Sequence, residues 1–111
     1  MEAKMHSKNK GNSGEREIVS IAKSHNLAAT RIPLSGSMQN FKGDVLIEGK
    51  IYGVKRWKRI LPKAVKEDLE KFTGCFIRED RGKWYVIIPA EYFFELVKKE
   101  AKNEPVIDVF F

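Results

Sequence analysis

The chain has little cysteine, little histidine and no long apolar run. Its 111 residues include one cysteine, Cys75, and two histidines, His6 and His25. A lone cysteine excludes an intramolecular disulfide, and no Cys/His cluster has the spacing of a structural zinc site. No stretch approaches the roughly 18 apolar residues of a membrane span, and the N-terminus lacks the apolar segment of a signal peptide. We therefore expect a reduced, cytoplasmic protein with no membrane contact.

Acidic residues are scarcer than basic ones. Lysine and arginine number 21 against 15 aspartates and glutamates, which gives a formal net charge of +6 and a pI of about 9.5. This excess favours a polyanionic partner such as nucleic acid. It is concentrated in one run that contains no acidic residue before Glu67, and phosphate is its natural ligand. The run comprises Lys55, Arg56, Lys58, Arg59, Lys63 and Lys66.

The length and the hydrophobic share of 42% suit one domain with one modest core. Residues 1–13 carry three lysines among small polar residues and have little to bury, which predicts a flexible basic arm. Residues 14–111 would then form a single domain. Its patterns follow the order helix, strands, helix, strands, helix, which is typical of an α/β fold with a central mixed β-sheet flanked by helices. The spacing predicts helices over 13–25, 62–74 and from 89 onward, a strand over 28–32, and hairpins over 44–57 and 75–88.

The first predicted hairpin sets an acid beside an amine. A type II′ turn at Gly49-Lys50 would join the strands and set Asp44 directly opposite Lys55, with Cβ atoms about 5 Å apart. The alternative interpretation of this pair is a structural ion pair. In the same register, the face toward the core consists of Val45, Ile47, Tyr52 and Val54.

Glu15 is a second candidate acid, since its spacing from Ile18 and Ala22 places it on the inward face of the first helix. The alternative is helix capping, because Asn12 and Glu15 have the spacing of a capping box. Two carboxylates, a lysine and a basic surround are the minimum for hydrolysis of a phosphodiester with Mg²⁺. The lysine would orient the attacking water or stabilise charge on the phosphate.

Several short motifs, in their joint order, resemble the archaeal and phage Holliday-junction resolvases, which belong to the PD-(D/E)xK nucleases. The resemblance implies a restriction-endonuclease-like fold and a homodimer that cleaves four-way junction DNA with Mg²⁺, for which Mn²⁺ would substitute, and with no small-molecule cofactor. A phage-encoded member would act in the host cytoplasm. The motifs are Lys10 to Glu17, Arg31 in a strand, Ser35-Gly36, Gly43-Asp44 and Gly53-Val54-Lys55.

The resemblance also implies roles for single residues. Asp44, Glu15 and the carbonyl of Val54 would hold the metal, and Glu15, Asp44 and Lys55 would be catalytic. Arg16 and Arg31 would lie near the scissile phosphate, and Ser35 in a loop that positions the cleaved strand. Together with the basic runs, this predicts DNA contacts from Lys10, Arg16, Arg31, Ser35, Arg56, Lys58 and Arg59.

One position departs from the family pattern. Where the family has Glu-x-Lys, this chain has Gly53-Val54-Lys55, so a metal-binding carboxylate is missing. Glu48 cannot replace it, because four strand steps separate Glu48 from Asp44 by about 13 Å. We therefore expect a variant that binds DNA but cleaves it poorly, whether the glycine is natural or engineered.

The aromatic residues suggest further contacts. Trp57 is predicted to lie in the core, with stacking on a base or sugar as the alternative. On the third helix Phe93, Leu96 and Val97 are predicted to face inward. The apolar surface expected to remain exposed, and to form a homodimer interface, comprises Tyr92, Phe94, Phe110 and Phe111.

Rival functions stay open at this point. The chain could be a non-catalytic nucleic-acid-binding module with a decayed site, an endonuclease of the same fold that acts on duplex or branched DNA, or a basic structural protein of a nucleoprotein particle. The Gly53→Glu variant distinguishes the first rival from a nuclease, since a decayed binding module would stay inactive in cleavage. Competition between a junction and an equal-length duplex separates the second, and a metal soak with no ion near Asp44 would favour the third.

Overall fold

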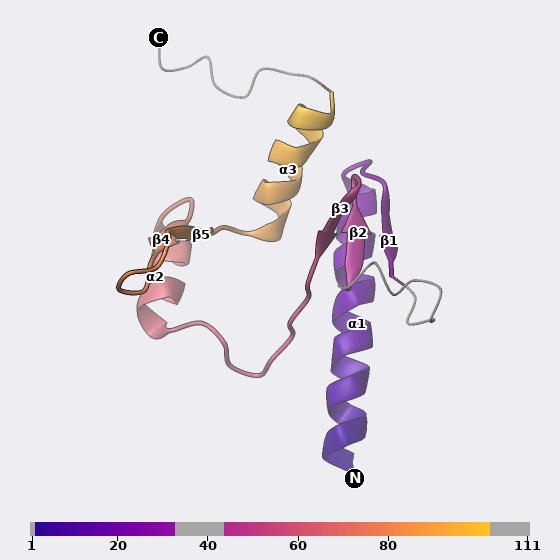
Figure 1. Ribbon diagram of the computed structural model, residues 1–111, viewed down its shortest axis with the longest axis horizontal. Coiled ribbons are helices and arrows are strands. Elements are labelled where there is room, and N and C mark those ends of the chain that lie inside the picture. The colour runs from indigo at the N-terminus through magenta and orange to yellow at the C-terminus, as the bar shows by residue number, and fades with distance from the viewer. Residues whose placement is uncertain (1, 33–43, 103–111) are drawn as a thin grey trace.

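The computed structural model describes residues 2–32 and 44–102, and the side chains from Ser13 onward within those ranges. Three helices and five strands follow the predicted order (Figure 1). The elements are α1 (Glu2–Ser24), β1 (Ala29–Arg31), β2 (Val45–Ile47), β3 (Lys50–Tyr52), α2 (Lys63–Lys71), β4 (Cys75–Ile77), β5 (Tyr85–Ile87) and α3 (Ala90–Ala101).

The α/β class is confirmed, but the described strands form two small antiparallel sheets instead of one mixed sheet. The first sheet has the order β1-β2-β3, and the second consists of β4 and β5. The second sheet and the β2-β3 pair are hairpins, whose short connections can join only antiparallel neighbours.

Helix α1 begins well before the predicted start at residues 13–14. It includes residues 2–13, the predicted basic arm, and ends at Ser24. Asn26 follows with a φ of 63°, the left-handed conformation of a helix C-cap, as the sequence predicts. The division into an arm and a nuclease domain stays a prediction.

The core lies where α1, the first sheet and α3 meet. Phe94 is 2% exposed, so its predicted place on an outer, dimer-forming face is wrong. The side chain packs beside the His25 ring, with 5.9 Å between ring centroids, and α3 thereby packs on α1. Phe110 and Phe111 lie outside the described residues. The main buried cluster comprises Val19, Ala22, Leu27, Val45, Ile47 and Phe94.

The β2-β3 turn differs from the predicted one by one residue. Glu48 and Gly49 form it with φ values of 48° and 79°, as in a type I′ turn, and Ile47 pairs with Lys50. Glu48 tolerates this backbone because its carboxylate accepts a hydrogen bond from the Ala28 N–H at 2.6 Å. The predicted register is therefore wrong by two residues. The faces are unchanged, since side chains alternate with period two.

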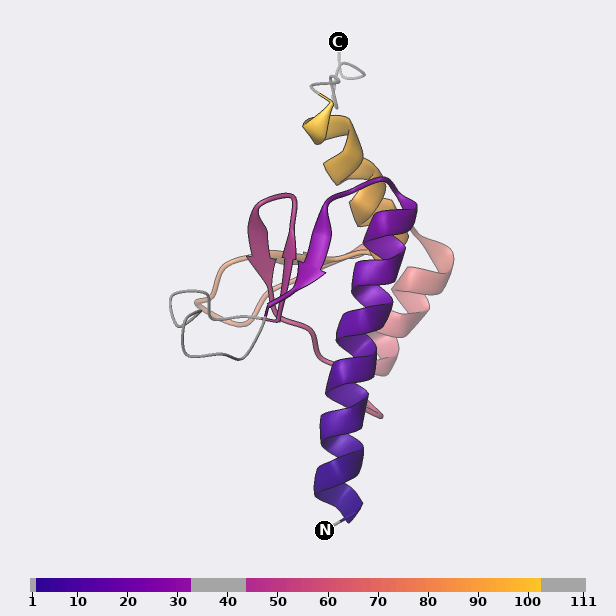
Figure 2. The ribbon, with the colours of Figure 1, turned by 90° about the vertical axis from the view of Figure 1, so that its right-hand side faces the viewer.

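Helix α2, β4 and β5 stand apart from α1 and the first sheet (Figure 1). In the view of Figure 2, turned by 90°, α2 lies partly behind α1. Helix α2 packs against β4, as the predicted order of these elements suggests. Much of this unit's apolar surface is uncovered. No helix among the described residues is long and apolar enough to cross a membrane. The exposed large apolar side chains of the unit are Phe72, Phe76, Ile77, Trp84, Tyr85 and Val86.

Candidate active site

Asp44 lies at the start of β2, where β1 and β3 flank it. Its backbone N–H donates to the Tyr52 carbonyl and its carbonyl accepts from the Ile32 N–H. These bonds to two neighbouring strands hold the residue in place. The Oδ2 atom accepts a hydrogen bond from the Val54 N–H at 2.6 Å. The carboxylate is therefore fixed in direction while it remains partly open to solvent.

Lys55 reaches Asp44 by a different route from the predicted one. Strand β3 ends at Tyr52, so Lys55 is not a cross-strand partner of Asp44. Its side chain nevertheless places Nζ 3.8 Å from Asp44 Oδ2. Both groups are partly exposed, and a pair of this kind contributes little to stability. The alternative interpretation of Asp44 and Lys55 as a purely structural ion pair therefore explains little, because such a pair adds little stability.

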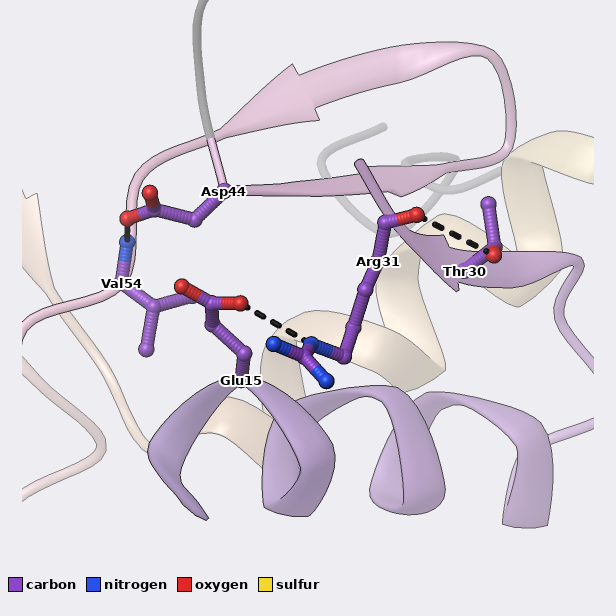
Figure 3. A network of polar contacts seen from close by, with 5 residues as sticks. All are labelled: Glu15, Thr30, Arg31, Asp44 and Val54. Atoms are coloured by element: carbon purple, nitrogen blue, oxygen red, sulfur yellow. Dashed lines mark hydrogen bonds and ion pairs between the residues drawn. The ribbon is translucent and has the colours of Figure 1, made fainter. Parts of the chain in front are cut away.

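Glu15 extends from α1 toward the same region. Its Oε1 accepts a hydrogen bond from Arg31 Nε at 3.0 Å. Figure 3 shows the Glu15 carboxylate between Arg31 and Val54, on the side of Val54 where Asp44 also lies. The carboxylate is mostly shielded from solvent, which gives the contact with the guanidinium more weight than at an open surface. Glu15 of α1 therefore lies near Val54 and Asp44, and Lys55 lies beside Asp44. The shared catalytic and metal-binding roles of these residues remain predictions.

Gly53 lies against this pair of charged groups. A Cβ atom built at Gly53 would be 3.8 Å from Lys55 Nζ and 3.9 Å from Asp44 Oδ2, which are ordinary contact distances. Its φ lies outside the left-handed region, so the backbone does not require glycine here. A longer acidic side chain at this position has space beside Asp44.

The described residues contain no group of three or more acidic, histidine or cysteine side chains that could hold a metal ion. Glu48 does not complete such a group, because it lies in the turn and binds the Ala28 N–H. Cys75 lies in β4, which among the described elements contacts α2 and β5 and not those that carry Asp44 and Glu15. Desolvation by burial, followed by its contact with Asp68, raises the pKa of this thiol.

A cleft of about 410 Å³ opens beside the site, between α1, the chain after β3 and the start of α3. Gly53, Val54 and Lys55 line it together with the apolar side chains of Phe93 and Phe94. Two further lining residues, Arg56 and Glu17, form an ion pair with Nε 3.8 Å from Oε1. The sequence analysis missed this pair and the Arg31–Glu15 contact, because neither spacing nor register relates these residues.

The predicted DNA contacts separate into three groups. Arg16, Arg56, Lys58 and Arg59 are exposed, as contacts to a phosphate backbone require. Arg31 is half-buried on Glu15, so it orients that carboxylate as well as adding positive charge. The Lys10 side chain and Ser35 lie outside the described part of the chain. The binding and catalytic roles of all these residues remain predictions.

The profile of the archaeal Holliday junction resolvase family matches residues 6–104. The match covers most of the chain and contains every candidate site residue described above. No curated protein and no solved structure matches the chain. The matched range includes both sheets, α2, α3 and all of α1 except residues 2–5. The chain therefore has the restriction-endonuclease-like α/β fold of this family, with a small sheet. The chain therefore belongs to the archaeal Holliday junction resolvase family.

Proposed function

We propose that this protein is a Mg²⁺-dependent, structure-selective endonuclease that resolves four-way DNA junctions as a homodimer, with cleavage impaired by Gly53. The observation that carries the proposal is the convergence of Asp44, Lys55 and Glu15 in a chain of this family. The basic run that follows Lys55 supports a phosphate-rich substrate.

The donor set fits magnesium. Mg²⁺ prefers oxygen ligands and is often held by one or two carboxylates together with waters and substrate phosphates. Asp44 and Glu15 would supply the carboxylates, and the carbonyl of Val54 a third oxygen. The ion would offset negative charge on the scissile phosphate and ease deprotonation of the attacking water. A Glu side chain at residue 53 would add a protein ligand beside Asp44, which is why we propose that Gly53 weakens cleavage.

The chain's own residues would do the remaining work. The Lys55 ammonium is close enough to Asp44 to orient a water molecule or to stabilise charge that develops on the phosphate. Arg31 would hold the Glu15 carboxylate toward the site. The Val54 N–H would keep Asp44 in one orientation, so that little rearrangement is needed when the phosphate arrives.

The homodimer is supported by the apolar surface of α2, β4 and β5. Phe76 is 74% exposed, and Trp84 and Tyr85 are almost as open. Phe76 and Val86 lie on one face of the β4-β5 hairpin and Ile77 and Tyr85 on the other, and large exposed apolar surface of this kind marks an interaction site. A second copy related by a twofold axis would cover it and would place two active sites on a junction that has the same symmetry.

Competition binding and a cleavage assay test the proposal. We expect an immobile four-way junction to displace a labelled junction at lower concentration than an equal-length duplex does, with affinity that falls steeply as salt rises. We expect Gly53→Glu to cleave the junction with Mg²⁺ far faster than the present chain. Equal competition by duplex would favour a nuclease for plain duplex DNA. An inactive Gly53→Glu would favour a non-catalytic binding module.

A further inference from the structure

Trp57 is exposed, contrary to its predicted place in the core. It lies on the irregular segment 53–62 that joins β3 to α2, and 61% of its surface is open to solvent. Within the described residues no ring or cation packs on its indole, whereas Trp84 carries Arg78 at 5.3 Å from its ring. The largest apolar side chain of this segment is therefore presented to solvent, with its ring faces available.

The surroundings of Trp57 are basic. Arg56, Lys58 and Arg59 flank it and are exposed. Among the described residues, Lys58 and Arg59 form no ion pair, and Arg56 has only the 3.8 Å contact with Glu17. Proteins hold unpaired nucleic-acid strands by combining a positive groove with aromatic side chains on which bases stack. An interface between protein chains usually has few charges at its centre, so this composition favours a nucleic acid over a protein partner.

The position of Trp57 relates it to the candidate site. One residue, Arg56, separates it from Lys55, so the Cα atoms of Lys55 and Trp57 lie at most about 7 Å apart. This distance corresponds to about two base steps of roughly 3.4 Å each. A strand whose phosphate lies at Asp44 and Lys55 would therefore bring its next nucleotides to the indole.

We propose that Trp57 stacks on a base left uncovered at a branch point, and that this contact contributes to selection of branched over duplex DNA. The inference rests on the proposed nuclease function. Inside a duplex both faces of each base are covered by neighbours, whereas a base at a branch has a free face. Stacking on Trp57 therefore favours the branched substrate without reading any sequence, since every base has a π-face.

Fluorescence of the full chain tests the contact directly. In a Trp84→Phe background Trp57 is the only tryptophan, and Phe keeps an aromatic ring at the other site. Titration with an immobile four-way junction, without Mg²⁺, is expected to quench and shift the Trp57 emission. An equal-length duplex, titrated until the protein is saturated, is expected to change it much less.

Affinity measurements supply the second readout. By fluorescence anisotropy of labelled DNA, Trp57→Ala should weaken junction binding about 5- to 100-fold and duplex binding less than about twofold. Trp57→Phe should retain most of the affinity because it keeps a stacking ring. Tyr92→Ala is the matched control, an exposed aromatic residue on α3 outside both the basic segment and the proposed dimer surface, and should leave junction affinity within about twofold of the unchanged chain.

The outcomes separate the inference from the function on which it rests. A chain that binds junction and duplex equally would overturn the junction function and this inference with it. A chain that prefers junctions, with unchanged Trp57 emission and a Trp57→Ala variant of equal preference, would overturn the inference alone. If sedimentation gave a lower mass for the Trp57→Ala variant than for the unchanged chain, Trp57 would belong to a contact between subunits. That result would also overturn the inference.

Discussion

The two halves of this small protein use their apolar residues differently. Helices α1 and α3 enclose one face of the first sheet, and the side chains between them are buried. In the unit of α2, β4 and β5, by contrast, only Val65 and Cys75 are buried among residues 63–88. The first half has a core of its own, whereas the second half presents its largest apolar side chains to solvent. The apolar residues of the first half therefore serve to stabilise the fold. We propose that those of the second half serve association with another molecule.

The difference extends to the candidate site. Glu15 lies on α1 and Asp44 is held between β1 and β3 by backbone hydrogen bonds, whereas Lys55 lies on the irregular segment that follows β3. Trp57 and the basic residues Arg56, Lys58 and Arg59 that would meet DNA lie on the same irregular segment between the halves. Rigid placement of catalytic groups and adaptable placement of binding groups is a common division in enzymes.

The largest expected effect concerns stability. Phe94→Ala should lower the free energy of unfolding by about 3–5 kcal/mol, because it leaves a cavity in the core. Phe76→Ala removes the same ring from the second half, where it is exposed, and should change the free energy by about 0.5 kcal/mol or less in the monomer. Urea unfolding at low protein concentration measures both. Similar losses for the two variants would remove the distinction between the halves.

The next effect concerns cleavage. In a Gly53→Glu background, Asp44→Asn should reduce Mg²⁺-dependent junction cleavage at least about 100-fold, since it removes one of the proposed metal ligands. Asp80→Asn, in the β4-β5 turn, is the matched control and should leave the rate unchanged. The rates come from single-turnover assays on a labelled junction. Full activity of the Asp44→Asn variant would place the chemistry elsewhere.

Self-association should depend on the second half. Tyr85→Glu sets a charge in the exposed apolar surface and should weaken the dimer at least about tenfold, because an unpaired charge is costly to bury. Tyr92→Glu, on α3, tests the surface favoured by sequence and should leave dimerisation unchanged. Sedimentation equilibrium distinguishes them. If Tyr92→Glu weakened the dimer and Tyr85→Glu did not, the dimer interface would lie on α3.

The smallest effect concerns salt dependence. Lys58→Ala and Arg59→Ala should each reduce the slope of log affinity against log salt concentration by about one, as expected for the loss of one phosphate contact. Lys99→Ala, near the end of α3, is the control and should keep the slope. A slope unchanged in the first two variants would exclude the segment after β3 from the DNA interface.

The element order could be predicted from sequence, because it depends on local patterns, whereas the chemistry of the candidate site stays a prediction. Period-two alternation placed Val45 and Ile47 on the buried face even though the turn was misassigned. Glu48 in a left-handed turn could not be foreseen, since the hydrogen bond to Ala28 that supports it joins residues distant in sequence. The same limit applies to Phe94, whose burial depends on how α3 meets α1, and to the contact of Arg31 with Glu15.

The central claim is that Asp44 and Glu15 belong to a metal site from which residue 53 lacks its carboxylate. Titration with Mn²⁺, followed by electron paramagnetic resonance of the free ion, tests it without DNA or activity. Gly53→Glu should bind Mn²⁺ at least about tenfold more tightly than the present chain, Gly53→Gln should not, and Asp44→Asn should abolish the gain. Equal binding by the Glu and Gln variants, or a gain that survives Asp44→Asn, would contradict the account.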